Sequence, residues 1–283
     1  MISTHYGSKS TYTMIQTLPL FLELDQHLIA LLGSLSPEEW EKPTLAGHWK
    51  VKDVAYHLLD GNIRGISQSR DKHFPTIPDG TYKSITHFIN DQNQLWVSVA
   101  QRISFPLLIQ LMKTSSHTYY EHLSKLDLMA KALFPVSWAG EKESLNWFHI
   151  AREYTEKWHH QQQILQAVGR PSPIMEERFY LPFLDTCMYA LPHHYQSVEA
   201  EEGTSIQFSI SPLTAAWTLI REANKWVLSK EEKRVNTSVN IPDDIAWRIF
   251  TRGISQEEAE QDVAILGDQK LGRHILSMLT FMI

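Results

Sequence analysis

The stretch from residue 145 to residue 168, LNWFHIAREYTEKWHHQQQILQAV, carries several side chains that can bind a metal ion. It contains neither Pro nor Gly, and its length gives about six helical turns. At about 100° per residue, a stripe about 60° wide holds His149, Glu153, Glu156 and His160. Glu156 and His160 lie one turn apart, so their ends point at the same place. A carboxylate and an imidazole at this spacing can bind one divalent ion.

This pair also has a simpler interpretation, because Glu and His at this spacing occur often on solvated helix faces as a weak surface pair. The helix alone favours that interpretation, so a metal site requires a third ligand. A second helix, predicted to begin near Lys50, carries His57 on the shoulder of its apolar face. Two imidazoles and one carboxylate with an open fourth position are typical of a catalytic divalent site, with zinc as the first choice and nickel as an alternative. His57, Glu156 and His160 therefore form a candidate set of three metal ligands, although on its own His57 is better interpreted as a half-buried helix histidine bonded to a backbone carbonyl.

The elements that position these residues are predicted from hydrophobic periodicity and from capping signals. Up to Val168 the chain is expected to be almost entirely helical, as an up-and-down bundle of about four main helices. The Ser36-Pro37-Glu38-Glu39 run is a capping box that starts one further short helix. Within this region, helices are expected over residues 13–35, about 50–64, 84–103, 105–126 and 145–168, with loops at 71–82 and 129–142.

Gly169 and the Pro-rich run after it end the last of these helices and mark the best domain boundary. We predict two domains, a helical bundle over residues 1–170 and a small α+β domain over residues 171–283. In the second domain, helices are expected at 179–189, 243–250 and 256–281, one strand at 205–209, a hairpin from 216–220 and 225–228, and an alternating strand at 235–241.

Composition excludes several classes of protein. The net charge is −6, and no basic excess or polybasic segment indicates binding to nucleic acid or to a membrane surface. The longest apolar runs are too short to span a bilayer, and the first 14 residues lack the layout of a signal peptide. Cys187 is the single cysteine, which excludes an intrachain disulfide and a cysteine-based zinc ribbon. These features favour a cytoplasmic location.

Two segments resemble a known superfamily. SPEEWEKPTLAGHWKVKDVAYHLLDGNIR and, much later, REYTEKWHHQQQILQAVGRP are similar to the DinB-like metal-dependent superfamily, in particular its mycothiol-dependent maleylpyruvate isomerase-like branch. The branch has a Trp-x-x-x-Asp-x-x-x-His-Leu segment, matched here by Trp49, Asp53, His57 and the leucine after it. Its Glu-x-x-x-His pair on the fourth helix is matched by residues 156 and 160. Many DinB relatives have His-x-x-x-His there, so the glutamate favours the isomerase-like branch.

The resemblance covers about residues 14–170 and extends weakly to the remainder, which looks like the sterol-carrier-like α+β domain of that branch. It implies a metal-dependent enzyme that uses a low-molecular-weight thiol, such as mycothiol or an analogue, on a small electrophilic substrate. The reaction would be an isomerisation or an S-transfer. The family's second domain can supply an arginine to the substrate pocket, and Arg221, Arg248 and Arg252 are candidates, with Arg248 as our choice.

Two alternatives remain open at this point, a metal-dependent hydrolase and a metal-binding or small-ligand-binding protein without turnover. The sequence does not indicate the oligomeric state. Of the other polar residues, His149 and Glu153 are expected to support the ligands, and either could replace one of them. His159 is expected outside the site, because it points about 100° away from His160. Cys187 is expected to pack as a small apolar side chain.

Overall fold

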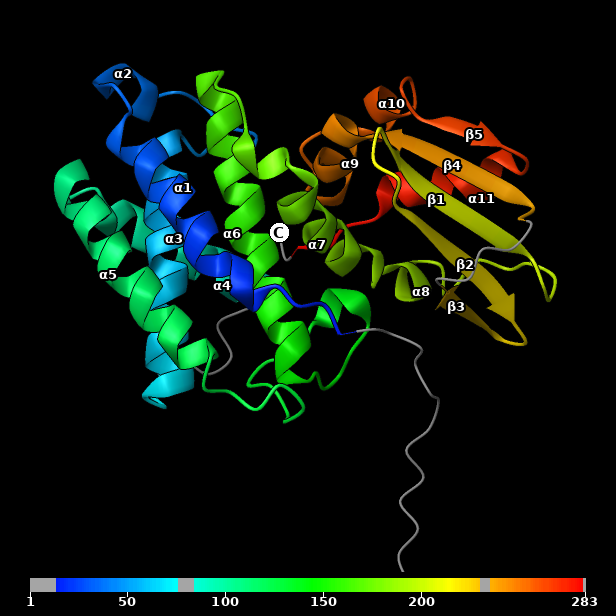
Figure 1. Cartoon of the computed structure of the whole chain (residues 1–283), viewed down its shortest axis with the longest axis horizontal. Coiled ribbons are helices and arrows are strands. Elements are labelled where there is room, and N and C mark those ends of the chain that lie inside the picture. Colours follow the sequence, from blue (N-terminus) through cyan, green and yellow to red (C-terminus); the bar gives the residue numbers. More distant parts are fainter. Residues whose placement is uncertain (1–13, 76–83, 230–234, 282–283) are drawn as a thin grey trace, which may run out of the picture.

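The computed structural model describes residues 14–75, 84–229 and 235–281. Long helices form one side of the molecule, and a five-stranded sheet with shorter helices forms the other (Figure 1). The helices are α1 (Phe21–Gly33), α2 (Pro37–Trp40), α3 (Val51–Gly65), α4 (Ile85–Ala100), α5 (Phe105–Leu123), α6 (Asn146–Val168), α7 (Glu177–Met188), α8 (Leu191–His194), α9 (Asp243–Phe250), α10 (Gln256–Ala259) and α11 (Gln269–Arg273). The strands are β1 (Ser205–Ser211), β2 (Ala216–Glu222), β3 (Lys225–Ser229), β4 (Thr237–Pro242) and β5 (Ala264–Leu266).

The helices up to α6 form a bundle in which α1 and α3 each contact both α5 and α6, while α4 packs against α3. The predicted long helices are confirmed, with small differences at their ends. The first helix was expected to begin at residue 13, which lies outside the described residues. In the structure α1 begins at Phe21, after a single 3-10 turn at Leu18–Leu20. Pro19 lies within that turn and has no N–H to donate, which explains the later start of the regular helix.

Polar contacts join the segment around the start of α2 to the end of α6. The capping box of α2 is confirmed, with the Glu39 carboxylate accepting from the Ser36 N–H at 2.8 Å. The same carboxylate accepts from Arg170 Nη2 at 2.7 Å, and Arg170 Nη1 donates to Ser34 Oγ at 2.5 Å. Arg170 follows Gly169, which ends α6 in the left-handed conformation at φ 71°. The end of α6 is thereby fixed to the start of α2.

The sheet has the strand order β3-β2-β1-β4-β5. The predicted hairpin is confirmed, with β2 and β3 pairing antiparallel around a turn that contains Ala223 at φ 47°. The central pair β1 and β4 is parallel, and β5 closes the edge antiparallel to β4. The predicted helix at 243–250 is confirmed as α9.

The prediction of one helix over residues 256–281 is wrong. The structure has the short α10, then β5, then α11 and a 3-10 helix at His274–Ser277, followed by an extended segment. Gly267 explains part of the difference, because its φ of 93° breaks any helix. A Cβ there would also meet the carbonyl oxygen of Asn236 at 2.3 Å, so only glycine allows this approach of the chain to β4.

The hydrophobic core is continuous between the bundle and the sheet. The indole of Trp158 on α6 is fully buried, and its ring lies 4.8 Å from that of Tyr180 and 4.2 Å from that of Phe183, both on α7. Trp247 on α9 completes the contact at 6.4 Å. The boundary predicted after residue 170 therefore stays a prediction, since packing crosses it. Among the described residues, no helix is long and apolar enough to cross a membrane.

Candidate metal centre

The candidate site lies between α3 and α6, which are in contact within the bundle (Figure 1). The start of α3 is fixed by Asp53, whose Oδ2 accepts from the Lys50 N–H at 2.9 Å. His57 lies one turn further along α3. On α6 the run from residue 146 to residue 168 is an uninterrupted helix, so the spacing of its polar stripe is preserved.

The structure brings together the three predicted ligands. One donor atom from each of His57, Glu156 and His160 lies within 4.8 Å of the other two. His160 Nε2 and Glu156 Oε2 are 3.6 Å apart, close to the separation of about 3.4 Å that two ligand atoms have in a tetrahedral zinc shell. The rings of His57 and His160 meet edge to face at 4.8 Å. This geometry needs only small side-chain rotations to close on one ion.

Both imidazoles are neutral near pH 7. Burial lowers the pKa of His160 to about 4, although the hydrogen bond that its ring donates to Gln163 acts in the opposite direction. Burial also lowers the pKa of His57 well below its ordinary value, and the charge that His160 carries when protonated and the charge of Arg64 lower it further. A metal ion binds the neutral imidazole, so both rings are in the form that ligation requires.

Glu156 lies at the open side of the site, with 32% of its side-chain surface exposed. Burial of the carboxyl raises its pKa to about 7, while the charges of Arg152 and Arg64 act in the opposite direction. A carboxyl with this pKa changes its protonation near neutral pH, and a cation beside it would favour the ionised form. Of the three residues, His160 is buried, whereas His57 and Glu156 are half-buried.

Two observations show that the residues fit a metal ion. Gln163 Oε1 accepts from His160 Nδ1 at 2.9 Å, which places the lone pair of Nε2 towards Glu156. Nδ1 of His57 is buried and has no hydrogen-bond partner among the described residues. A buried polar nitrogen without a partner is costly, and a cation at this place would satisfy it. The donor set of two imidazoles and one carboxylate is typical of zinc.

The other two residues of the polar stripe form a separate network. Arg152 Nη2 donates to His149 Nδ1 at 2.9 Å and to Glu153 Oε1 at 2.5 Å, and the Tyr119 hydroxyl donates to Glu153 Oε2 at 2.9 Å. Burial alone would raise the pKa of Glu153, but Arg152, His149 and the Tyr119 hydroxyl together lower it. Glu153 therefore has partners on both oxygens, which leaves Glu156 as the free carboxylate of the stripe.

Sequence reasoning missed several neighbours of the site. Gln163 follows His160 by three residues, a helical spacing that could have indicated the contact. His159 was expected outside the site, and it is not one of the three clustered donors, yet its ring lies 3.8 Å from that of His160. The ring of Trp49 lies 5.0 Å from that of His57, and its Nε1 donates to Gln94 Oε1 at 3.2 Å. Trp49 is half-buried and forms a wall of the site.

Arg248, the predicted substrate arginine, lies on α9, where its guanidinium pairs with Asp244 at 3.3 Å and its Nε is buried without a partner. The nearby Gly253 lies against Leu45, because a Cβ at Gly253 would meet Leu45 Cδ1 at 3.1 Å. Leu45 belongs to the turn before Trp49, so this end of α9 reaches the segment that leads into the site. Whether Arg248 contacts a substrate stays a prediction.

Comparison with known proteins identifies the fold. No protein-family model matches the sequence, and no curated protein matches it significantly. Among solved structures, the crystal structure of the mycothiol-dependent maleylpyruvate isomerase is similar, with a TM-score of 0.53 and 12% identity over 84% of this chain and 88% of that one. The structure of a histidine-to-alanine mutant of that isomerase is also similar, with a TM-score of 0.52 and 13% identity over 90% of this chain and 93% of that one. The chain therefore has a fold similar to that of maleylpyruvate isomerase.

Proposed function

We propose that this protein is a divalent-metal-dependent enzyme that activates a low-molecular-weight thiol and adds it to a small electrophilic substrate. The observation that carries the proposal is the convergence of His57, Glu156 and His160 beside an open side of the site. The similarity in fold to an isomerase named as mycothiol-dependent supports the thiol and the reaction class of isomerase or S-transferase.

In this proposal the two neutral imidazoles and the Glu156 carboxylate hold the ion, and Gln163 fixes the orientation of His160. When bound, zinc, or nickel as the alternative, would supply positive charge that lowers the pKa of a thiol. The indole of Trp49 covers His57 and excludes water from that side. Arg248 is the proposed contact for a negatively charged substrate group.

The thiol must come from a cosubstrate, because the chain has a single cysteine that cannot react. Cys187 is fully buried, as expected, and burial raises the pKa of its thiol to about 12. A thiol in that environment is not ionised near neutral pH and cannot reach a substrate. Mycothiol or an analogous small thiol in the cytoplasm is the proposed cosubstrate, with no role for nucleic acid or membrane.

The first test is the metal content of the purified chain by elemental mass spectrometry, beside His57→Ala, Glu156→Ala and His160→Ala. We expect about one divalent ion per wild-type chain and its loss in all three variants, with the helical circular dichroism retained. The bundle keeps its fold because its apolar core does not include the ion. Retention of stoichiometric metal in His160→Ala would contradict the ligand set.

The second test adds small thiols and electrophilic substrates to the metal-loaded chain. The proposal expects turnover that requires both the thiol and the metal. Hydrolysis without thiol would instead indicate a metal-dependent hydrolase, and tight metal binding without turnover would indicate a binding protein.

A further inference from the structure

Five aromatic rings form a continuous row through the candidate site. They are those of Trp49, His57, His160, His159 and Phe281, with centroid distances of 5.0, 4.8, 3.8 and 4.1 Å between successive rings. The first four belong to the bundle, whereas Phe281 belongs to the extended segment that follows the sheet. The row therefore joins the far end of the sequence to a predicted metal ligand.

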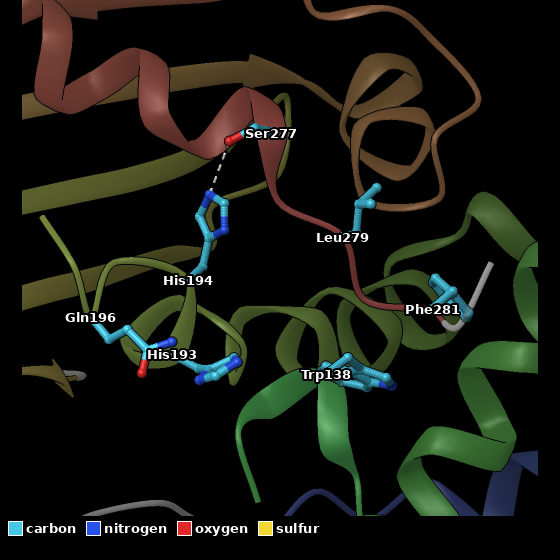
Figure 2. Close-up of a pocket in the computed structure, with 7 residues that line it drawn as sticks. All are labelled: Trp138, His193, His194, Gln196, Ser277, Leu279 and Phe281. Atoms are coloured by element: carbon cyan, nitrogen blue, oxygen red, sulfur yellow. Dashed lines mark hydrogen bonds between the residues drawn. The ribbon is translucent and has the colours of Figure 1, made fainter. Parts of the chain in front are cut away.

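The segment that carries Phe281 is fixed in place. It leaves the 3-10 helix at Ser277, passes Leu279 and runs to the helices of the bundle, where Phe281 points away from the sheet (Figure 2). The Thr280 N–H donates to the Phe250 carbonyl oxygen at 3.1 Å, and its hydroxyl lies 3.4 Å from Cys187 Sγ. Thr280 is fully buried, so α9 and α7 hold the residue beside Phe281 on both sides.

His159 lies between Phe281 and His160, and its ring contacts both of theirs. Its Nδ1 donates to the Thr155 carbonyl oxygen at 3.0 Å, which fixes one edge of the ring. Phe281 covers the ring on one side and His160 lies on another, at interplanar angles of 49° and 36°. His159 is 5% exposed and Phe281 is 8% exposed, so both rings are buried where they meet.

The geometry points to Phe281 as a positioning residue for the metal centre, acting through His159 to hold the imidazole of His160. This inference rests on the proposed function, because it assumes that His160 is a ligand. A ligand imidazole must be held both at its edge and at its face. Gln163 holds the edge of the His160 ring through a hydrogen bond, and the ring of His159 contacts its face. Outer-shell support of this kind sets both metal affinity and ligand geometry.

The cavity of about 380 Å³ shown in Figure 2 lies on the other side of this segment. Phe281 and Trp138 form apolar parts of its wall, and His193, Gln196 and Ser277 supply polar groups. Phe281 therefore has the cavity on one side and the ring of His159 on another.

The test compares zinc affinity of the full chain with that of Phe281→Ala, by competition with a chelator of known affinity. Phe281→Ala is expected to bind zinc about 10-fold more weakly, at the low end of the range for outer-shell residues. Phe281→Leu keeps an apolar side chain on His159 and is expected to restore part of the affinity. If Phe281→Ala does not fold, the zinc affinity of Phe281→Leu is compared with that of the wild type instead.

Phe148→Ala is the matched control, because Phe148 is a buried phenylalanine on α6 that packs against Trp147 and Tyr189. It should lower thermal stability without changing zinc affinity. The absorption spectrum of the Co²⁺-loaded chain gives a second readout. We expect changed d–d bands in Phe281→Ala and unchanged bands in Phe148→Ala, because only the first alters ligand geometry.

A double-mutant cycle tests the route through His159. If Phe281 acts through that ring, Phe281→Ala should cost little further zinc affinity in a His159→Ala background. Additive losses, or equal losses in Phe281→Ala and Phe148→Ala, would overturn the inference while leaving the metal centre intact. Wild-type chain that binds no zinc would instead overturn the proposed function and this inference together.

Discussion

Gln163 acts on the candidate site through a single hydrogen bond to His160, and single residues of this kind decide how well a metal is held. The bond fixes which nitrogen of the imidazole faces Glu156. Replacing the amide by an apolar group of similar shape would free the ring without changing the ligand set. Gln163 is 3% exposed, so water cannot easily take its place.

We expect Gln163→Met to weaken zinc binding by about 10–100-fold, because the acceptor for His160 Nδ1 is lost. Gln163→Glu keeps an acceptor and should stay closer to wild type. Titration with a competing chelator measures both. Wild-type affinity in Gln163→Met would contradict the role assigned to this bond.

The raised pKa of Glu156 predicts a pH-dependent stability of the metal-free chain. Its ordinary value is 4.5, and burial raises it to about 7. Between these values the folded chain keeps a proton that the unfolded chain has released, so the contribution of this group to stability falls as the pH rises. Metal-free Glu156→Gln should therefore have a higher Tm than wild type at pH 8 and a similar Tm at pH 5. A difference in Tm that is the same at both pH values would contradict the raised pKa.

The residue pattern of α6 was sufficient to predict that Glu156 and His160 would lie close together. His57 needed a resemblance as well, because nothing in its own helix distinguishes a ligand from a half-buried histidine. The roles of His159 and Phe281 could not be predicted. Their contact joins segments more than 100 residues apart, and such contacts leave no periodic signal in the sequence.

Three helices of the bundle are joined by one buried polar group, the ammonium of Lys157 on α6. It donates to Asp25 Oδ1 on α1 at 2.7 Å and to Asn62 Oδ1 on α3 at 2.9 Å. A buried ion pair adds little net stability relative to apolar residues, but removing one partner leaves a buried charge. This cluster therefore fixes how α1, α3 and α6 are aligned.

Lys157→Met is expected to lower the free energy of unfolding by about 3–5 kcal/mol, because Asp25 would be buried without its cation. The double variant with Asp25→Leu should recover much of that loss. Lys52→Met is the surface control, since its partner Glu41 is exposed, and it should cost less than about 1 kcal/mol. Urea unfolding measures all three, and equal losses in Lys157→Met and Lys52→Met would contradict the argument.

The long regular helices were predicted well, and so were the short α2, α9 and the hairpin of β2 and β3, whereas the segment after residue 256 was not. The helices α3, α5 and α6 each repeat an apolar face over several turns, which specifies them locally. The segment from residue 256 to residue 281 has apolar residues at mixed spacing. Its strand β5 exists because β4 offers an open edge, and that edge is a property of the fold.

The bundle and the sheet unit share one hydrophobic core, so the whole molecule should unfold as one cooperative unit. Near-UV and far-UV circular dichroism should report the same midpoint in urea. Trp158→Ala removes the ring that contacts both α7 and α9 and should cost about 3–5 kcal/mol while leaving a single transition. Two separated transitions in wild type would show that the parts fold independently and would support the boundary predicted after residue 170.

The ion pair between Glu39 and Arg170 also has a consequence for related chains. The capping run before α2 and the Gly-Arg pair after α6 look like two separate signatures, 131 positions apart, but their side chains bind each other. Glu39 accepts from the Ser36 N–H and from Arg170, and Arg170 donates to Ser34 as well, so a change at either residue loses more than one interaction. In homologous chains the two positions should therefore change together, and an acidic side chain should accompany every arginine that is retained.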